Sequence, residues 1–323
     1  ALPFGSYSVQ EKSAPAGYIV DDTVHTMTLA YKDQNTPVVS VTIKADNELQ
    51  TGGVKIRKIT EKFNHEKIDF YNALAEGYVF GLYTAETIGD LPAEVLVEVL
   101  TTDDQGIAES TTKLPHGKYY LKELAVPVET IEMLTEKIPL TIDSELNVQH
   151  YDSPIYNTMF KAKIGVYKLD AADNDRALAG AMFEGRDASG KLFDTIKTND
   201  RGYAETIEIP VGIYKVKEIA PPAGFILSDE VKTITLTTED KETAVFERTN
   251  KANEVTLTKT DLTTSAPVPG ATVEIYGKDG KLFYKGVTDK DGKITINGVV
   301  GTLVVTETAT IPGYTIDEAS RTQ

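Results

Sequence analysis

The sequence predicts an all-β protein made of tandem Ig-like β-sandwich domains arranged as an elongated rod. Three observations carry this prediction: a strand pattern that recurs along the chain, turns rich in Gly and Pro, and a composition that favours strands. The 323 residues include 16 Tyr, 10 Phe, 24 Gly and 14 Pro, with no Trp, and helical periodicity is scarce. We expect one short helix, near residues 92–97, as a local insertion.

The composition excludes several functional classes. Hydrophobic residues make up 41% and charged residues 25% of the chain, a balance typical of folded, soluble domains. A net charge of −16 argues against binding to nucleic acid. No run of residues approaches the roughly 20 apolar positions that span a bilayer, so we expect no membrane insertion.

Cysteine is absent and histidine occurs only four times. A multidomain extracellular protein usually contains disulfides, so a chain without cysteine is either intracellular or stabilised by other means. The sequence also contains no nucleophile elbow and no cluster of metal ligands. We therefore expect no metal, no cofactor and no turnover of an external substrate.

A seven-residue box, here called the glutamate box, occurs four times. It begins with a turn glycine and ends with a glutamate, and the alternate positions between them are aromatic or aliphatic. Because side chains alternate across a strand, the glutamate shares a face with the apolar residues and is expected to point into a core. Burying a carboxylate without a partner is costly. The boxes are residues 5–11, 117–123, 212–218 and 301–307, and their glutamates are Glu11, Glu123, Glu218 and Glu307.

A second motif precedes three of the boxes. Residues 102–106, 198–202 and 288–292 each read Thr, then Asp or Asn, then two further residues and Gly. Such polar runs between apolar strands predict hairpin turns. The version at 288–292 resembles part of a calcium loop, but it lacks the flanking helices and the bidentate glutamate of an EF-hand. We expect a turn there and not a cation site.

Two further residue types recur in register with the boxes. Three strands place a lysine on their apolar face, namely Lys58, Lys168 and Lys259. An asparagine follows the first three box glutamates after 32 to 36 residues, giving Asn47, Asn157 and Asn250. Each could have an ordinary explanation, since a lysine can extend from an edge strand into water and an asparagine often marks a turn. Recurrence in register favours a shared function instead.

Lysine, glutamate and asparagine side chains that meet in an apolar core can form an amide bond. Burial disfavours the charged forms of an amine and of a carboxyl group. A neutral lysine is a nucleophile toward the asparagine carbonyl. A protonated glutamate can donate a hydrogen bond to that carbonyl and transfer protons while ammonia leaves. Holding the groups in contact supplies up to about 7–11 kcal/mol of the barrier reduction in well-oriented cases.

These motifs resemble the B-type repeats (Cna-B or SpaA-like domains) of Gram-positive collagen adhesins and sortase-assembled pilins. The resemblance implies prealbumin-like sandwiches in which a first-strand lysine bonds to a last-strand asparagine and the box glutamate catalyses the reaction. Carried over by position, it implies the sets Lys58–Glu123–Asn157 and Lys168–Glu218–Asn250.

The motif order sets the expected domain boundaries. Residues 51–160 and 161–252 contain complete sets, the first with an insertion. Residues 1–50 carry Glu11 and Asn47 without a lysine strand, so they are expected to be the C-terminal part of a domain. Residues 253–323 carry Lys259 and Glu307 and are expected to lack the last strand.

The leading functional interpretation is mechanical: a cell-wall-anchored extracellular stalk or pilus shaft stabilised by Lys–Asn bonds. Its expected partners are other domains of the same surface protein or pilus subunits. The alternative is an adhesin module, a virulence factor that binds a host extracellular-matrix protein or glycan through loops of the 51–160 domain. The long region 61–115 is where such a contact is expected.

Overall fold

The computed structural model describes residues 2–36, 38–143, 149–150, 154–240, 242–316 and 321–322. Every regular element in these ranges is a β-strand, so the predicted all-β class is confirmed. The chain divides into two compact units between Met159 and Phe160, next to the predicted boundary at 160. No helix in the described ranges is long and apolar enough to span a membrane.

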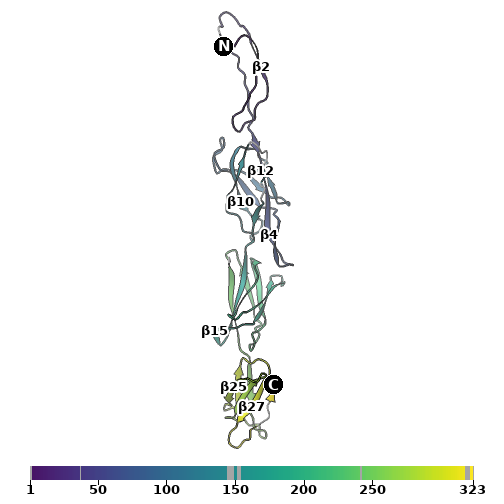
Figure 1. Cartoon of the computed structure of the whole chain (residues 1–323), viewed down its shortest axis with the longest axis vertical. Helices are drawn as coiled ribbons and strands as arrows, with labels where there is room; N and C mark the ends of the chain where they lie inside the picture. The colour runs from purple at the N-terminus through teal and green to yellow at the C-terminus, as the bar shows by residue number, and fades with distance from the viewer. Residues whose placement is uncertain are drawn as a thin grey trace. The chain divides into compact units, whose positions relative to one another are not determined.

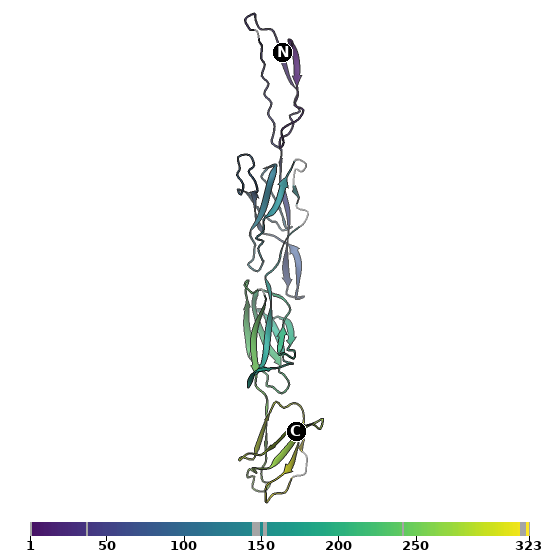
Figure 2. The same ribbon diagram turned by 60° about the vertical axis from the view of Figure 1, so that its left-hand side comes forward.

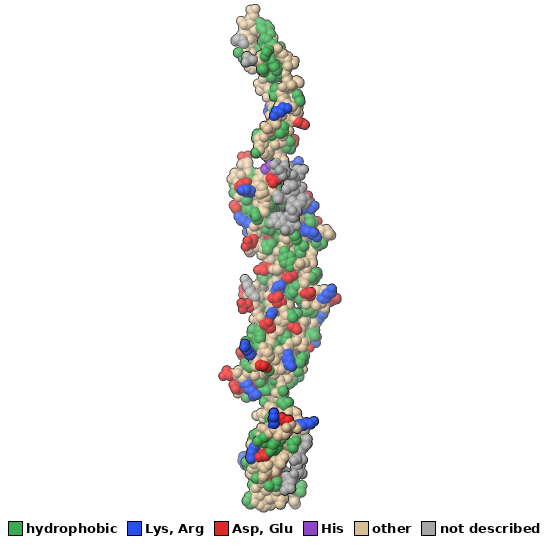
Figure 3. All heavy atoms as spheres, in the orientation of Figure 1, with side chains coloured by type: hydrophobic (Ala, Val, Ile, Leu, Met, Phe, Trp, Pro, Cys, Tyr) green, Lys and Arg blue, Asp and Glu red, His purple; other side chains and the backbone are tan. Residues whose placement is uncertain are grey.

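The first unit begins with a small antiparallel sheet. β1 (Gly5–Val9) pairs with β2 (His25–Leu29) in register Gly5↔Leu29. Residues 2–36 and 38–50 otherwise form an open loop whose two arms run side by side (Figures 1 and 2). Large apolar side chains here, such as Phe4, Tyr31 and Val38, are more than half exposed, and Figure 3 shows hydrophobic side chains along this end of the chain.

Two sheets follow within residues 51–157, and β10 and β4 mark them in Figure 1. One sheet has the order β11-β10-β6-β7. In the other, β4 is central and pairs with β5, β8, β12 and β13, while β3 and β9 form a short ribbon. The strands are β3 (Thr51–Gly52), β4 (Val54–Asn64), β5 (Asp69–Leu74), β6 (Val79–Thr84), β7 (Leu96–Thr101), β8 (Ile107–Glu109), β9 (Leu114–Pro115), β10 (Gly117–Ala125), β11 (Ile138–Ile142), β12 (Gln149–His150) and β13 (Ile155–Asn157).

The second unit repeats this arrangement. One sheet has the order β17-β16-β20-β21, and in the facing sheet β14 pairs with β15, β18, β19 and β22. The strands are β14 (Lys161–Asp170), β15 (Asp173–Ala177), β16 (Met182–Asp187), β17 (Leu192–Lys197), β18 (Tyr203–Glu205), β19 (Ile209–Pro210), β20 (Gly212–Ala220), β21 (Val231–Leu236) and β22 (Thr243–Asn250).

Fewer strands follow residue 252. In the part of the chain that the structure describes, β23 pairs with β26 in a two-stranded sheet, and the other sheet has the order β25-β24-β27-β28. The counterpart of β22 is not found beside β23 in the described residues. The strands are β23 (Glu254–Thr258), β24 (Thr272–Gly277), β25 (Leu282–Val287), β26 (Lys293–Asn297), β27 (Leu303–Ala309) and β28 (Arg321–Thr322).

The helix expected near residues 92–97 is wrong. Leu96 begins β7, which pairs with β6 through Leu82↔Glu98 and Gly81↔Val99. Glu94 has φ of 65°, in the left-handed region, which a right-handed helix does not contain. Pairing with a buried strand thus outweighs the local helix preference.

The box aromatic has a structural role in three of the boxes. The hydroxyl of Tyr119 donates to the carbonyl of Pro115 at 2.8 Å, and Tyr214 donates to Pro210 at 2.6 Å. Tyr7 makes the same contact with Pro3 at 2.6 Å. Burial raises the pKa of Tyr119 and of Tyr214 to about 12. The tyrosine therefore fills the core while its hydroxyl ties the start of the box strand to the preceding proline.

Candidate cross-linking sites

In residues 51–160, three predicted site residues meet in the core. Lys58 on β4, Glu123 on β10 and Asn157 on β13 are each at most 1% exposed. Lys58 Nζ contacts Asn157 Oδ1 more closely than an ordinary hydrogen bond. Asn157 Nδ2 donates to Glu123 Oε2 at 2.8 Å. Two residues that are 99 positions apart in the sequence thus meet, with the lysine amine against the asparagine side-chain amide.

The surroundings of Lys58 favour its neutral form. Burial lowers the pKa of Lys58 to about 8, against the opposing effect of the Glu123 charge. The ring of Tyr78 lies 5.0 Å from Lys58 Nζ. Glu123 Oε1 is buried without a hydrogen-bond partner among the described residues, although Oε2 also accepts from the backbone amide of Leu134 at 2.6 Å.

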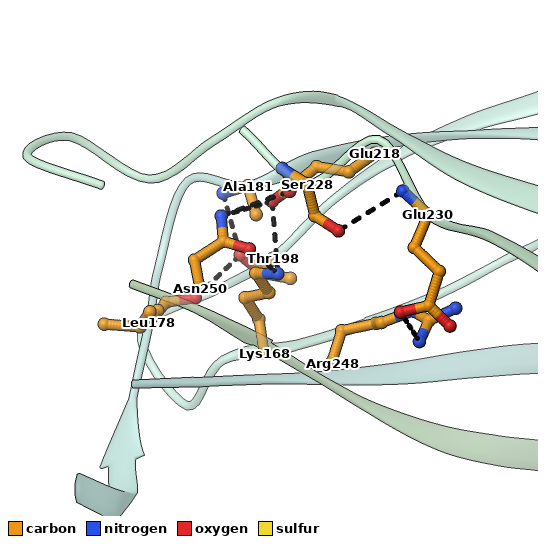
Figure 4. A network of polar contacts seen from close by, with 9 residues as sticks. All are labelled: Lys168, Leu178, Ala181, Thr198, Glu218, Ser228, Glu230, Arg248 and Asn250. Atoms are coloured by element: carbon orange, nitrogen blue, oxygen red, sulfur yellow. Dashed lines mark hydrogen bonds and ion pairs between the residues drawn. The ribbon is translucent and has the colours of Figure 1, made fainter. Parts of the chain in front are cut away.

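In residues 161–252 the second predicted set meets in the same way (Figure 4). Lys168 on β14 contacts Asn250 on β22, with 2.5 Å between Nζ and Oδ1. Glu218 on β20 reaches both groups: its Oε1 lies 3.3 Å from Lys168 Nζ and 2.9 Å from Asn250 Nδ2. The backbone amide of Ser228 holds Glu218 Oε2 at 2.9 Å. The glutamate therefore bridges the amine and the amide nitrogen.

The glutamate contacts a different atom of the asparagine from the one that the sequence predicted. That expectation placed its hydrogen bond on the asparagine carbonyl, whereas Glu123 and Glu218 both accept from the asparagine amide nitrogen. This nitrogen is the atom that leaves as ammonia if lysine attacks the amide carbon. A carboxyl group here is placed to deliver a proton to the leaving nitrogen.

Parallel pairing of the first and last strands explains why lysine and asparagine meet. β13 pairs with β4 in register Ile155↔Lys58, and β22 pairs with β14 in register Arg248↔Lys168. Asn157 and Asn250 each lie two residues beyond the lysine's partner. Positions two apart share a face of a strand, so the asparagine faces the same core as the lysine, two residues further along the chain.

The turn motif also positions the lysine, a role that sequence reasoning missed. The carbonyl of its glycine accepts the lysine backbone amide in all three copies, through the pairs Gly106–Lys58 at 2.7 Å, Gly202–Lys168 at 2.8 Å and Gly292–Lys259 at 2.7 Å. Each glycine has φ near 70°. The sequence did carry a signal for this role, namely the nearly constant spacing between the turn motif and the glutamate box.

The threonine of the turn motif anchors the same region. Thr198 donates from its hydroxyl to the carbonyl of Leu178 at 2.9 Å and accepts from the backbone amide of Ala181 at 3.0 Å (Figure 4). Thr102 is bonded in the same way to Ala75 and Tyr78. The predicted turns therefore exist and tie the lysine strand to the opposite sheet.

The first predicted partial site contains Glu11 and Asn47. Asn47 Nδ2 donates to Glu11 Oε2 at 2.6 Å, and the backbone amide of Asp21 donates to the same oxygen at 2.7 Å. This reproduces the glutamate–asparagine contact of the complete sites. The hydrogen bonds of the Glu11 carboxylate in the described residues come from these two donors, neither of which is a lysine.

The last predicted partial site contains Lys259 and Glu307. Lys259 Nζ donates to Glu307 Oε2 at 2.7 Å, and their side chains are 24% and 5% exposed. The sequence contains no asparagine after Glu307. Asp317, the one alternative acceptor considered for Lys259, lies outside the described residues. In the described residues this site is therefore a lysine–glutamate ion pair.

The first acidic side chain of the turn at 288–292 accepts hydrogen bonds from nearby backbone amides. Asp289 Oδ1 accepts from the backbone amides of Asp291 at 2.9 Å and Lys293 at 2.8 Å. Within the described ranges, no group of three or more His, Cys, Asp or Glu could hold a metal ion.

The fold and these sites define a class: tandem sandwiches in which a lysine of the first strand faces an asparagine of the last strand beside a core glutamate. The family model described as SpaA, a prealbumin-like fold domain, matches residues 61–153, 162–252 and 253–322. The chain belongs to this family, and the predicted resemblance is confirmed.

Three known proteins illustrate the relationship. The chain is 36% identical over 77 residues to the trypsin-resistant surface T6 protein of Streptococcus pyogenes, covering 24% of this chain and 14% of that protein. It is similar to the solved Bacillus anthracis TIE protein, with a TM-score of 0.63 and 26% identity over 86% of this chain and 49% of the other. For the major pilin subunit of Bacillus cereus, the TM-score is 0.42 and the identity 15%, over 85% and 95% of the two chains.

The chain therefore spans about half of the TIE structure and about one seventh of the T6 protein. It carries SpaA-like repeat domains with a prealbumin-like fold.

Proposed function

We propose that this chain is part of the structural stalk or shaft of a Gram-positive surface protein, an adhesin or a pilin, stabilised by self-formed bonds Lys58–Asn157 and Lys168–Asn250. The domains 51–160 and 161–252 are the cross-linked units. The location is extracellular and cell-wall-anchored, and the partners are other domains of the same protein or pilus subunits. Binding of a host ligand through the region 61–115 remains the alternative.

One observation carries the proposal: Glu218 contacts the Lys168 amine and the Asn250 amide nitrogen at the same time. Burial lowers the pKa of Lys168, and the Glu218 carboxylate opposes this shift. Once the amine has lost its proton, the carboxylate is placed to relay a proton from Nζ to the leaving Nδ2.

The reaction balances with these three side chains alone. Neutral Lys168 Nζ attacks Asn250 Cγ and forms a tetrahedral adduct. Glu218 takes a proton from Nζ and gives one to Nδ2, which leaves as ammonia when the Cγ–Nδ2 bond breaks. The products are an Nζ–Cγ amide and a glutamate in its starting state. Contact between the reacting groups before the reaction removes most of the entropic barrier.

The test is the intact mass of the folded chain. We expect a deficit of two ammonias relative to the sequence, with the linked peptides mapping to Lys58–Asn157 and Lys168–Asn250. Lys259 contributes no third loss because no asparagine follows Glu307. A fully folded chain with the unreduced mass would contradict the proposal.

The rate of the Lys58–Asn157 reaction should depend on pH. The pKa of Lys58 lies at about 8 because of burial, and only the neutral amine attacks. Below pH 8 the rate should rise about tenfold per pH unit, and it should level off above that. Chain kept unreacted in denaturant and refolded at a series of pH values gives this profile by mass spectrometry. A rate still rising steeply up to pH 10 would show that Lys58 keeps an ordinary pKa.

A further inference from the structure

Arg248 on β22 is an inward-facing cation that the proposed chemistry does not use. Its register partner on β14 is Lys168, and its side chain is 14% exposed. Arg248 Nη1 pairs with Glu230 Oε2 at 2.8 Å, whereas Nη2 is buried without a hydrogen-bond partner among the described residues. Figure 4 shows the Arg248 side chain running to Glu230 and the Lys168 side chain running to Asn250 and Glu218.

Like charges on neighbouring, inward-facing positions of paired strands are unfavourable. Arginine keeps its charge at every pH that a protein tolerates, so a change of charge that relieves the repulsion has to occur on lysine. Lysine relieves it in two ways: by losing its proton, or by becoming an amide nitrogen. Both changes lie on the route to the cross-link.

We propose that Arg248 is a positioning residue that promotes the Lys168–Asn250 bond by destabilising the ammonium form of Lys168. This inference rests on the proposed function. The charged groups that face Lys168 are Glu218 on β20 and Arg248 on β22. Burial lowers the pKa of Lys168 most, the Glu218 carboxylate raises it, and the Arg248 charge lowers it further. Glu230, which is 64% exposed, partly neutralises the arginine from outside.

The other complete site provides a comparison within the same chain. The position equivalent to Arg248 is Ile155, the register partner of Lys58. Ile155 is 5% exposed and packs in the core. The register partner of Lys58 is thus apolar, and site 58–157 serves as the internal reference for variants at Arg248.

The experiment follows both cross-links in one sample. Full chain kept unreacted in denaturant is refolded at pH values from 5 to 9, and each linked peptide is quantified against time after digestion. In Arg248→Met the rate profile for Lys168–Asn250 should move upward by about half to one pH unit, with a roughly threefold to tenfold lower rate on its acid limb. Arg248→Lys should restore the original profile. Glu230→Gln, which leaves the arginine charge uncompensated, should shift the profile in the opposite direction.

The possible outcomes distinguish an error in the role of Arg248 from an error in the proposed function. A lower rate at every pH without a shift of the profile would mean that Arg248 acts only through packing, and so would a failure of Arg248→Lys to restore it. If Arg248→Met does not fold, Glu230→Gln still decides, because an unshifted profile in that exposed variant contradicts the charge effect. If the unmodified chain forms neither cross-link, the proposed function itself is wrong.

Discussion

Replacing Glu218 by Ala should abolish the Lys168–Asn250 bond and leave the domain folded with both side chains chemically unchanged. Glu218 is the carboxyl group that contacts both reacting nitrogens. The proposed cross-link would join positions 82 residues apart, so its loss should remove about 4–5 kcal/mol of stabilisation from loop closure. For a domain of this size, the melting temperature should fall by roughly 20 °C or more.

Calorimetry and peptide mapping measure both effects. The matched control is Glu205→Ala, because Glu205 is a partly exposed carboxylate on β18 of the same domain that pairs with Lys163. This variant should retain the bond and nearly all the stability, since exposed ion pairs contribute at most about 1 kcal/mol. Loss of one ammonia from the Glu218→Ala domain would show that another group transfers the protons.

Replacing Gly202 by Ala should be the most damaging single-methyl change in the domain 161–252. An added Cβ would lie 2.6 Å from the Lys168 carbonyl oxygen, and the backbone at Gly202 has φ of +69°. The turn must move, and its carbonyl holds the Lys168 backbone amide. We expect a loss of about 3–5 kcal/mol in unfolding free energy and slower formation of the cross-link.

The Gly190→Ala variant separates the effect of backbone strain from the effect of a steric clash. Gly190 also has a positive φ, +89°, but an added Cβ there meets nothing within 4 Å. This control should cost only about 1 kcal/mol and should leave the cross-linking rate unchanged. Equal losses in the two variants would mean that the close approach of Gly202 to Lys168 has no particular importance.

Much of this arrangement could be predicted because it depends on period-two alternation. Once the box glutamate and the strand lysine share faces with apolar residues, their burial follows, and Lys58, Lys168, Glu123 and Glu218 are all buried. The spacing of the asparagines was informative for the same reason, since the last strand has to pair in register with the first.

Other features depend on contacts that no periodicity encodes. The helix predicted near 92–97 failed because β7 is held by its pairing with β6. The bond between the turn glycine and the lysine amide joins residues 34 positions apart in the case of Gly202 and Lys168 and depends on the folded turn. The position of Arg248 beside Lys168 follows from the parallel register of β14 and β22, which the sequence does not state.

The parallel pairing of β14 and β22 determines how much the cross-linked domain could lengthen under load. With Lys168 joined to Asn250, a stretching force entering along β14 crosses to β22 at the bond and leaves after Asn250. The residues between these two positions then carry no load, even if their own sheets come apart. Their separation of 82 residues corresponds to about 270–300 Å of chain when fully extended. A tether built from such domains would not release this length of chain under force. Its extension should therefore rise smoothly with the applied force, without the steps that unfolding domains produce.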